Sequence, residues 1–181
     1  MDRSVKITSG FIVLVVILGT YIVGSYHRLI YEKAEINAQW VVVESKLERK
    51  YDLISNLVET VKGSMKQEQE AFEKITDAKS KMVETTNIKE KIDATNKLDK
   101  SIGRILEVIE NYPELKSNET VIRLIYELTE AENNISAERD IYNDFVKEYN
   151  KSIQTIPKSI IIKVLDFEKA IYFETESKAN F

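Results

Sequence analysis

The 181-residue sequence has no cysteine, one histidine, two prolines and five glycines. Without cysteine the chain has neither disulfides nor thiolate metal sites, and it has no cysteine nucleophile. The single histidine, His27, excludes histidine-rich zinc sites, Glu-x-x-His di-iron pairs and a Ser-His-Asp triad in the bundle. The five glycines form no phosphate-binding motif. We therefore predict a protein that is not an enzyme and that binds no cofactor and no metal.

The scarcity of turn-forming residues favours helices over loops. Charged residues make up 31% of the chain, and glycine and proline are rare, a composition typical of long helices. The net charge at pH 7 is −4, which suits a phosphate backbone poorly. We expect no nucleic-acid partner.

Residues 7–26 read ITSGFIVLVVILGTYIVGSY and contain no charged side chain. A helix of this length spans about 30 Å, which matches the hydrocarbon core of a bilayer. We predict a transmembrane helix after a flank of residues 1–6, with membrane lipid as its partner. Within it, Thr8, Ser9, Thr20 and Ser25 can return their hydroxyls to backbone carbonyls. A cleavable signal peptide is the alternative interpretation of the same residues.

The charges on the two sides of this span are balanced. Arg3 and Lys6 precede it, and Arg28 and Lys33 follow it. Because the positive-inside rule depends on an asymmetry of basic residues, these flanks favour neither orientation. We predict a single-pass protein of the bacterial cell membrane and assign no side to its larger part.

Residues 27–36 are predicted to form a juxtamembrane connection that is continuous with the first long helix. After it, apolar residues recur at helical spacing through residues 37–181. Leu53, Leu57 and Val61, for example, fall on one side of a helical wheel whose other side is polar. We predict helices over residues 36–82, with a bend at Gly63, over 88–112 and over 118–155, where Ser117 or Asn118 is the N-cap. Residues 82–91 and 112–117 are predicted connections, and residues 159–173 a short helix or an extended tail. The expected fold is all-α, a transmembrane helix followed by an antiparallel bundle.

Several ordered blocks of this sequence are similar to one known family. They are KLERKYDLISNLVETVKG at residues 46–63, YPELKSN at 112–118, ELTEAENNI at 127–135, RDIYNDFVKEYN at 139–150 and YFE at 172–174. In this order they resemble the LemA family, although Ser55 and Gln67 stand where that family usually has proline and histidine. The resemblance implies a membrane-anchored, all-helical protein and implies no activity.

A Tyr-Asn pair occurs twice on the last long helix, at residues 142–143 and again seven residues later at 149–150. This spacing places both tyrosines on one stripe of the helix and both asparagines on the next. In one interpretation these side chains bond polar groups of the first long helix, and in the other they line a groove for a partner protein. The candidate residues are Arg49, Tyr51, Asp52, Asn56, Arg139, Tyr142, Asn143, Tyr149 and Asn150.

The function that this pattern favours is a non-enzymatic scaffold, anchored in the membrane and associating with other proteins or with further copies of itself. Two alternatives remain open. One is a signalling or sensory module that passes a conformational change across the bilayer. The other is a membrane-remodelling scaffold that acts as ordered oligomers.

Overall fold

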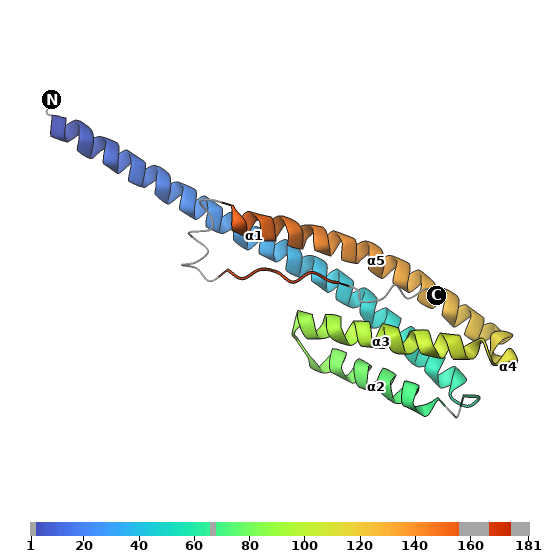
Figure 1. Cartoon of the computed structure of the whole chain (residues 1–181). Helices are drawn as coiled ribbons and strands as arrows, with labels where there is room; N and C mark the ends of the chain where they lie inside the picture. The colour runs from blue at the N-terminus through green and yellow to red at the C-terminus, as the bar shows by residue number, and fades with distance from the viewer. Residues whose placement is uncertain (1–2, 66–67, 156–166, 175–181) are drawn as a thin grey trace. The chain divides into compact units, whose positions relative to one another are not determined.

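The computed structural model describes residues 3–65, 68–155 and 167–174, with side chains from residue 9 onward. Every regular element in these ranges is a helix, which confirms the predicted all-α fold. The chain divides into two compact units: unit 1 is Met1–Ala38 with Asp144–Ala170, and unit 2 is Gln39–Asn143 with Ile171–Phe181. Helices α1 (Arg3–Val61) and α5 (Glu119–Gln154) contribute residues to both units (Figure 1).

In unit 1, the first part of α1 exposes its apolar side chains on every face. Phe11, Val15 and Leu18 expose 65%, 51% and 51% of their surface. The hydroxyl of Thr20 donates a hydrogen bond to the carbonyl of Ile17 at 2.9 Å, as predicted. Within the described part of the chain, this is the one helix that is long and apolar enough to cross a membrane.

Farther along α1, still in unit 1, the helix acquires a buried side. Leu29 and Ile36 are buried, and α5 adds the buried side chains of Val146, Tyr149 and Ile153. The three positions on α5 follow one another at steps of three and four residues, so they lie on one stripe of the helix. Helix α1 is therefore apolar on all faces at first and amphipathic later, and it has no break between the two parts.

Unit 2 brings four long helical segments around an apolar core. Helices α2 (Gln69–Glu84) and α3 (Ile88–Ile109) lie side by side as a hairpin, because only residues 85–87 join them (Figure 1). Two side chains of α1 show which helices meet, since Lys50 bonds residues of α3 and α5, and Tyr51 bonds residues of α2 and α3. Core residues of this unit include Leu47, Ile54, Leu57, Leu98, Ile102, Ile105 and Leu128.

The prediction of one helix over residues 36–82 is wrong. Helix α1 ends at Val61, residues 62–64 form a turn, and α2 begins at Gln69. The carbonyl of Val61 accepts the N–H groups of Ser64 and Met65, which closes the turn. Gly63 is about 1 kcal/mol less favourable in a helix than alanine. Leaving the helix here also buries Met65 completely, so the bend that we expected at Gly63 is a full reversal of the chain.

The remaining boundaries differ less from the prediction. The connection expected over residues 82–91 shortens to 85–87, and residues 112–117 contain a short helix, α4 (Pro113–Lys116). Pro113 occupies the first helical position, where a missing N–H costs no hydrogen bond. Asn118 caps α5 as predicted, because its side-chain oxygen accepts the N–H groups of Thr120 and Val121 at 2.9 and 3.2 Å.

The predicted short helix or extended tail at residues 159–173 falls partly on residues 156–166, which lie outside the described residues. Residues 167–174 contain no helix and run as an extended chain (Figure 1). For this part of the sequence, the extended alternative is the correct one.

Candidate functional site

In unit 2, residues 171–174 bind to the bundle through a site built around Phe173. The side chain of Asn143, on α5, holds the backbone of Phe173 from both sides. Its amide nitrogen donates to the Phe173 carbonyl at 3.0 Å, and its amide oxygen accepts the Phe173 N–H at 2.8 Å. The side-chain amide of asparagine has one donor and one acceptor. It can therefore make the two backbone hydrogen bonds that a residue of a neighbouring β-strand would make. We call this group, with the side chains described next, the Phe173 site.

The ring of Phe173 is buried beside the ring of Trp40 and the cation of Arg139. Only 2% of its surface is exposed, and its centroid lies 6.1 Å from that of Trp40 on α1. Tyr142 packs against Trp40 in a T-shaped arrangement with 5.5 Å between centroids. The guanidinium carbon of Arg139 lies 5.5 Å from the centroid of the Phe173 ring, which is within the range of a cation–π contact. Phe173 is therefore the anchor of the bound segment.

Two further side chains bond the backbone on either side of this anchor. The hydroxyl of Tyr142 donates to the carbonyl of Ile171 at 2.9 Å, and Asn96, on α3, donates to the carbonyl of Glu174 at 3.0 Å. Burial raises the pKa of Tyr142 to about 12, so its hydroxyl remains a donor at neutral pH. The segment is thus bound by its backbone and by one aromatic ring.

The second Tyr-Asn pair makes the same kind of contact within unit 1. Asn150 donates to the carbonyl of Ala170 at 2.9 Å and accepts the N–H of the same residue at 2.9 Å. The hydroxyl of Tyr149 donates to the carbonyl of Glu168 at 3.0 Å, and the ring of Phe167 lies 6.0 Å from that of Tyr26. The repeat in the sequence is therefore a repeat of one binding mode for extended backbone.

The structure separates the predicted site residues into two groups. Tyr142, Asn143, Tyr149 and Asn150 bond the backbone of residues 168–173. The expectation that their partners are polar groups of the first long helix is wrong. On that helix the side chains of Arg49, Asp52 and Asn56 are exposed, and Tyr51 is buried elsewhere, with its hydroxyl 2.8 Å from that of Thr95.

Sequence reasoning did not identify Trp40, Asn96 or Phe173 as members of the site. Trp40 and Asn96 lie on helices far from residues 142–143 in the sequence, so helical spacing within one segment could not connect them. A signal for Phe173 was present, because the block YFE at residues 172–174 is one of those shared with the LemA family. A short block shared with a family and lying beyond the long predicted helices is a reason to expect a specific contact.

A buried cluster of charges lies in the core of unit 2. Lys50 has no exposed surface, and its ammonium nitrogen lies 2.6 Å from Asp99 Oδ1 and 2.5 Å from Glu132 Oε2. Burial raises the pKa of the Asp99 carboxyl, and the neighbouring Lys50 offsets part of this rise. The cluster ties α1, α3 and α5 together. Lys50 lies on the same helix stripe as the core residues Leu47 and Ile54. A charged residue at this spacing was the sequence feature that could have indicated a buried charge.

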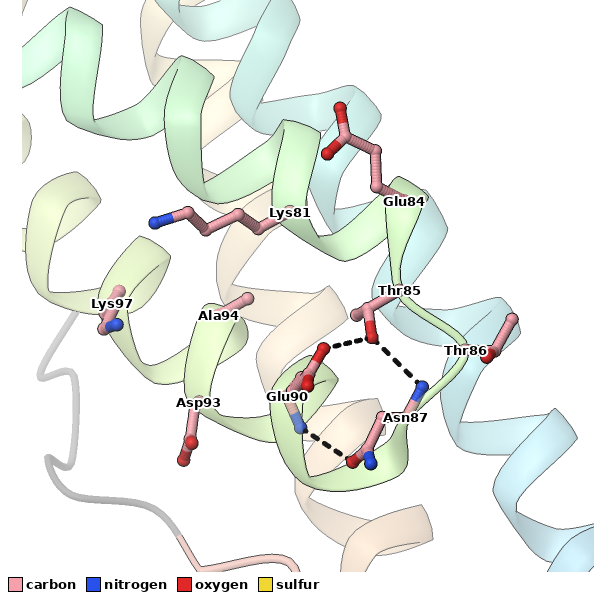
Figure 2. Close-up of a pocket in the computed structure, with 9 residues that line it drawn as sticks. All are labelled: Lys81, Glu84, Thr85, Thr86, Asn87, Glu90, Asp93, Ala94 and Lys97. Atoms are coloured by element: carbon pink, nitrogen blue, oxygen red, sulfur yellow. Dashed lines mark hydrogen bonds between the residues drawn. The ribbon is translucent and has the colours of Figure 1, made fainter.

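A surface pocket of about 670 Å³ lies at the link between α2 and α3. Figure 2 shows hydrogen bonds between pocket-lining residues of the link and of the first turn of α3. The hydroxyl of Thr85 donates to Glu90 Oε2 and accepts the N–H of Asn87, and the side chain of Asn87 accepts the N–H of Glu90. These contacts form the N-terminal cap of α3. Thr85, Asn87 and Glu90 therefore serve the local fold.

Comparison with known proteins identifies the family. The LemA family profile matches residues 39–180, which is most of the chain. The chain belongs to the LemA family. It is 23% identical to Protein LemA of Metamycoplasma hominis over 168 residues, which cover 91% of this chain and 75% of that protein. The family resemblance inferred from the sequence blocks is confirmed.

This LemA family chain also shares a shorter region with magnetosome proteins. It is 31% identical over 74 residues to Magnetosome protein MamQ 2 of Paramagnetospirillum magneticum, a match that covers 41% of this chain. The corresponding identity with Magnetosome protein MamQ of Magnetospirillum gryphiswaldense is 26% over 73 residues. The chain spans about a quarter of the length of these relatives (27%).

Proposed function

We propose that this LemA family chain is a non-enzymatic scaffold, anchored in the bacterial cell membrane by a single span over residues 7–26, that presents its helical bundle to other proteins and to further copies of itself. The observation that carries the proposal is the uncharged stretch at the start of α1, whose large apolar side chains are exposed on every face. Burying one such side chain contributes roughly 1.5–3 kcal/mol. The stretch as a whole therefore favours lipid over water.

The continuity of α1 supports a scaffold role. The helix runs from Arg3 to Val61 without a break, so the span and the part of α1 in unit 2 belong to one element. The portion beyond residue 26 is about 50 Å long at 1.5 Å per residue. A helix of this length can hold binding surfaces away from the lipid headgroups.

Two aspartates placed in the span test the anchor. We expect the double variant Val15→Asp/Leu18→Asp to leave the membrane fraction, because each acidic residue at the centre of a span costs about 2.5–3.5 kcal/mol. The matched control is Val83→Asp, since Val83 lies on α2 and exposes 78% of its surface. The control and the natural chain should resist alkaline extraction from membranes. Equal extraction of all three chains would refute the anchor.

The scaffold role is tested in the same cells by chemical crosslinking. If the bundle recruits proteins at the membrane, crosslinked complexes should form with the natural chain and with Val83→Asp. Complexes with recruited proteins should be lost with Val15→Asp/Leu18→Asp, and circular dichroism should show that the helical bundle of this variant is intact. An absence of crosslinked partners and of crosslinked copies for the natural chain would contradict the scaffold role.

A further inference from the structure

The Phe173 site binds its segment in the way that peptide-recognition domains bind extended peptides. Of its four hydrogen bonds to residues 171–174, two come from Asn143 and one each from Tyr142 and Asn96, and all four involve the backbone of the segment. The one deeply buried side chain is Phe173, which is 2% exposed, whereas the neighbouring Tyr172 is 38% exposed. Backbone bonds that supply affinity and one pocket that supplies specificity are the features of such recognition.

The segment contributes no helix to the bundle. Residues 167–174 lack regular secondary structure, and the helices of unit 2 close their own hydrogen bonds without them. Release of the segment therefore costs the contacts of the Phe173 site and leaves α1, α2, α3 and α5 formed. It also uncovers the rings of Trp40 and Tyr142, now 6% and 1% exposed, which favours filling the site again.

We propose that the Phe173 site is exchangeable between two copies of this chain, so that each copy binds residues 171–174 of the other. The structure shows that this sequence occupies the site, and a second copy carries the identical sequence. Reciprocal exchange remakes every hydrogen bond and aromatic contact, which is why segment swapping is a low-cost route to a dimer. In unit 1, Asn150 makes the same pair of hydrogen bonds to the backbone of Ala170, and these bonds would also form again after exchange.

This inference deepens the self-association part of the proposed function. Anchoring in one membrane raises the local concentration of the copies and so favours exchange between them. The binding step itself needs no membrane, because every contact lies in unit 2. A test in detergent solution therefore measures segment exchange even if the membrane-anchor proposal is wrong.

The experiment mixes two full-length variants that fill their own sites poorly. The receptor, Phe173→Ala, keeps the pocket and lacks the anchor ring. The donor, Asn143→Ala/Trp40→Phe, keeps Phe173, has a weakened pocket and contains no tryptophan, because Trp40 is the only one in the sequence. We expect the tagged receptor to capture at least about tenfold more donor than a matched donor that also carries Phe173→Ala. The emission of Trp40 in the receptor should shift to shorter wavelength as the donor ring covers it.

Circular dichroism of each variant establishes that its helices are intact before mixing. A milder receptor variant, Phe173→Leu, serves where Phe173→Ala does not fold, and its residual occupancy should lower the capture. Equal capture of the two donors would place the association on another surface and overturn the proposal. An absence of capture together with unchanged Trp40 emission would also overturn it, and would show that the segment serves only its own copy.

Discussion

Removal of the buried ammonium of Lys50 tests the energetics of the bundle most severely. Lys50 is fully buried between Asp99 and Glu132, at 2.6 and 2.5 Å, and these carboxylates come from two different helices. In Lys50→Met the apolar part of the side chain is retained and the charge is lost. Two carboxylates that are 7% and 18% exposed then face each other without the cation between them.

The expected loss is large because the remaining charges stay buried. Removing one partner from a buried ion pair typically costs about 3–5 kcal/mol, chiefly the desolvation of the charge left behind. Folded domains have a free energy of unfolding of about 5–15 kcal/mol. We therefore expect Lys50→Met to lose at least about a fifth of the free energy of unfolding at about pH 8. The variant Asp99→Asn should lose less, because Lys50 keeps Glu132 as a partner.

The loss should depend on pH in a defined direction. Burial raises the pKa of Asp99 in the folded chain. The stability that this carboxyl contributes is fully present below its unfolded pKa of about 3.9, and it is lost as pH rises through the higher folded value. Without Lys50 the folded pKa of Asp99 moves higher still. The stability gap between the natural chain and Lys50→Met should therefore widen as pH rises from about 4.

Urea unfolding of the full chain in detergent, followed by circular dichroism, measures this gap at several pH values. Lys97→Met is the matched control, because Lys97 is an exposed lysine of α3. Its effect should stay within about 0.5 kcal/mol at every pH. A loss for Lys50→Met below about 1 kcal/mol, or a gap that stays constant with pH, would refute the account of a desolvated charge cluster.

Substitutions at two further positions test a helix interior and a helix end. Gly103 lies inside α3, and a Cβ built there meets no atom within 4 Å, so Gly103→Ala should stabilise the chain by up to about 1 kcal/mol, read as a higher urea midpoint; a lower midpoint would contradict this. Asn118→Ala removes the cap of α5 and should cost about 0.5–2 kcal/mol, whereas Asn118→Asp should retain most of the stability. Equal unfolding midpoints for these two Asn118 variants would argue against the cap.

The sequence was sufficient for those parts of the fold that depend on local signals. Thr20 bonds its own helix, Asn118 caps α5, and the uncharged stretch before His27 lies on one long helix, because each effect involves residues within a few positions of one another. The end of α1 was predicted wrongly for a physical reason. The turn at Gly63 is compensated by the burial of Met65, which is a tertiary contact that periodicity does not report.

The candidate site shows the same division. The seven-residue repeat correctly identified Tyr142 and Asn143 as candidate binding residues, because such a repeat predicts which side chains share a stripe of one helix. It could not identify what those side chains bind, because their partners lie at residues 171–173, in a segment without helical or strand periodicity. Lys50 was overlooked for a related reason: its two carboxylate partners lie 49 and 82 residues away.

The most direct test of the membrane anchor compares two valines that the fold itself leaves exposed. Val15 and Val83 expose 51% and 78% of their surface, so the fold alone gives no reason for the two positions to differ in labelling. Each is replaced by cysteine in this cysteine-free chain and treated with a water-soluble maleimide in isolated membranes. We expect Val83→Cys to be labelled and Val15→Cys to be labelled only after the membrane is dissolved in denaturant. Equal labelling of both positions in intact membranes would contradict a lipid-embedded α1.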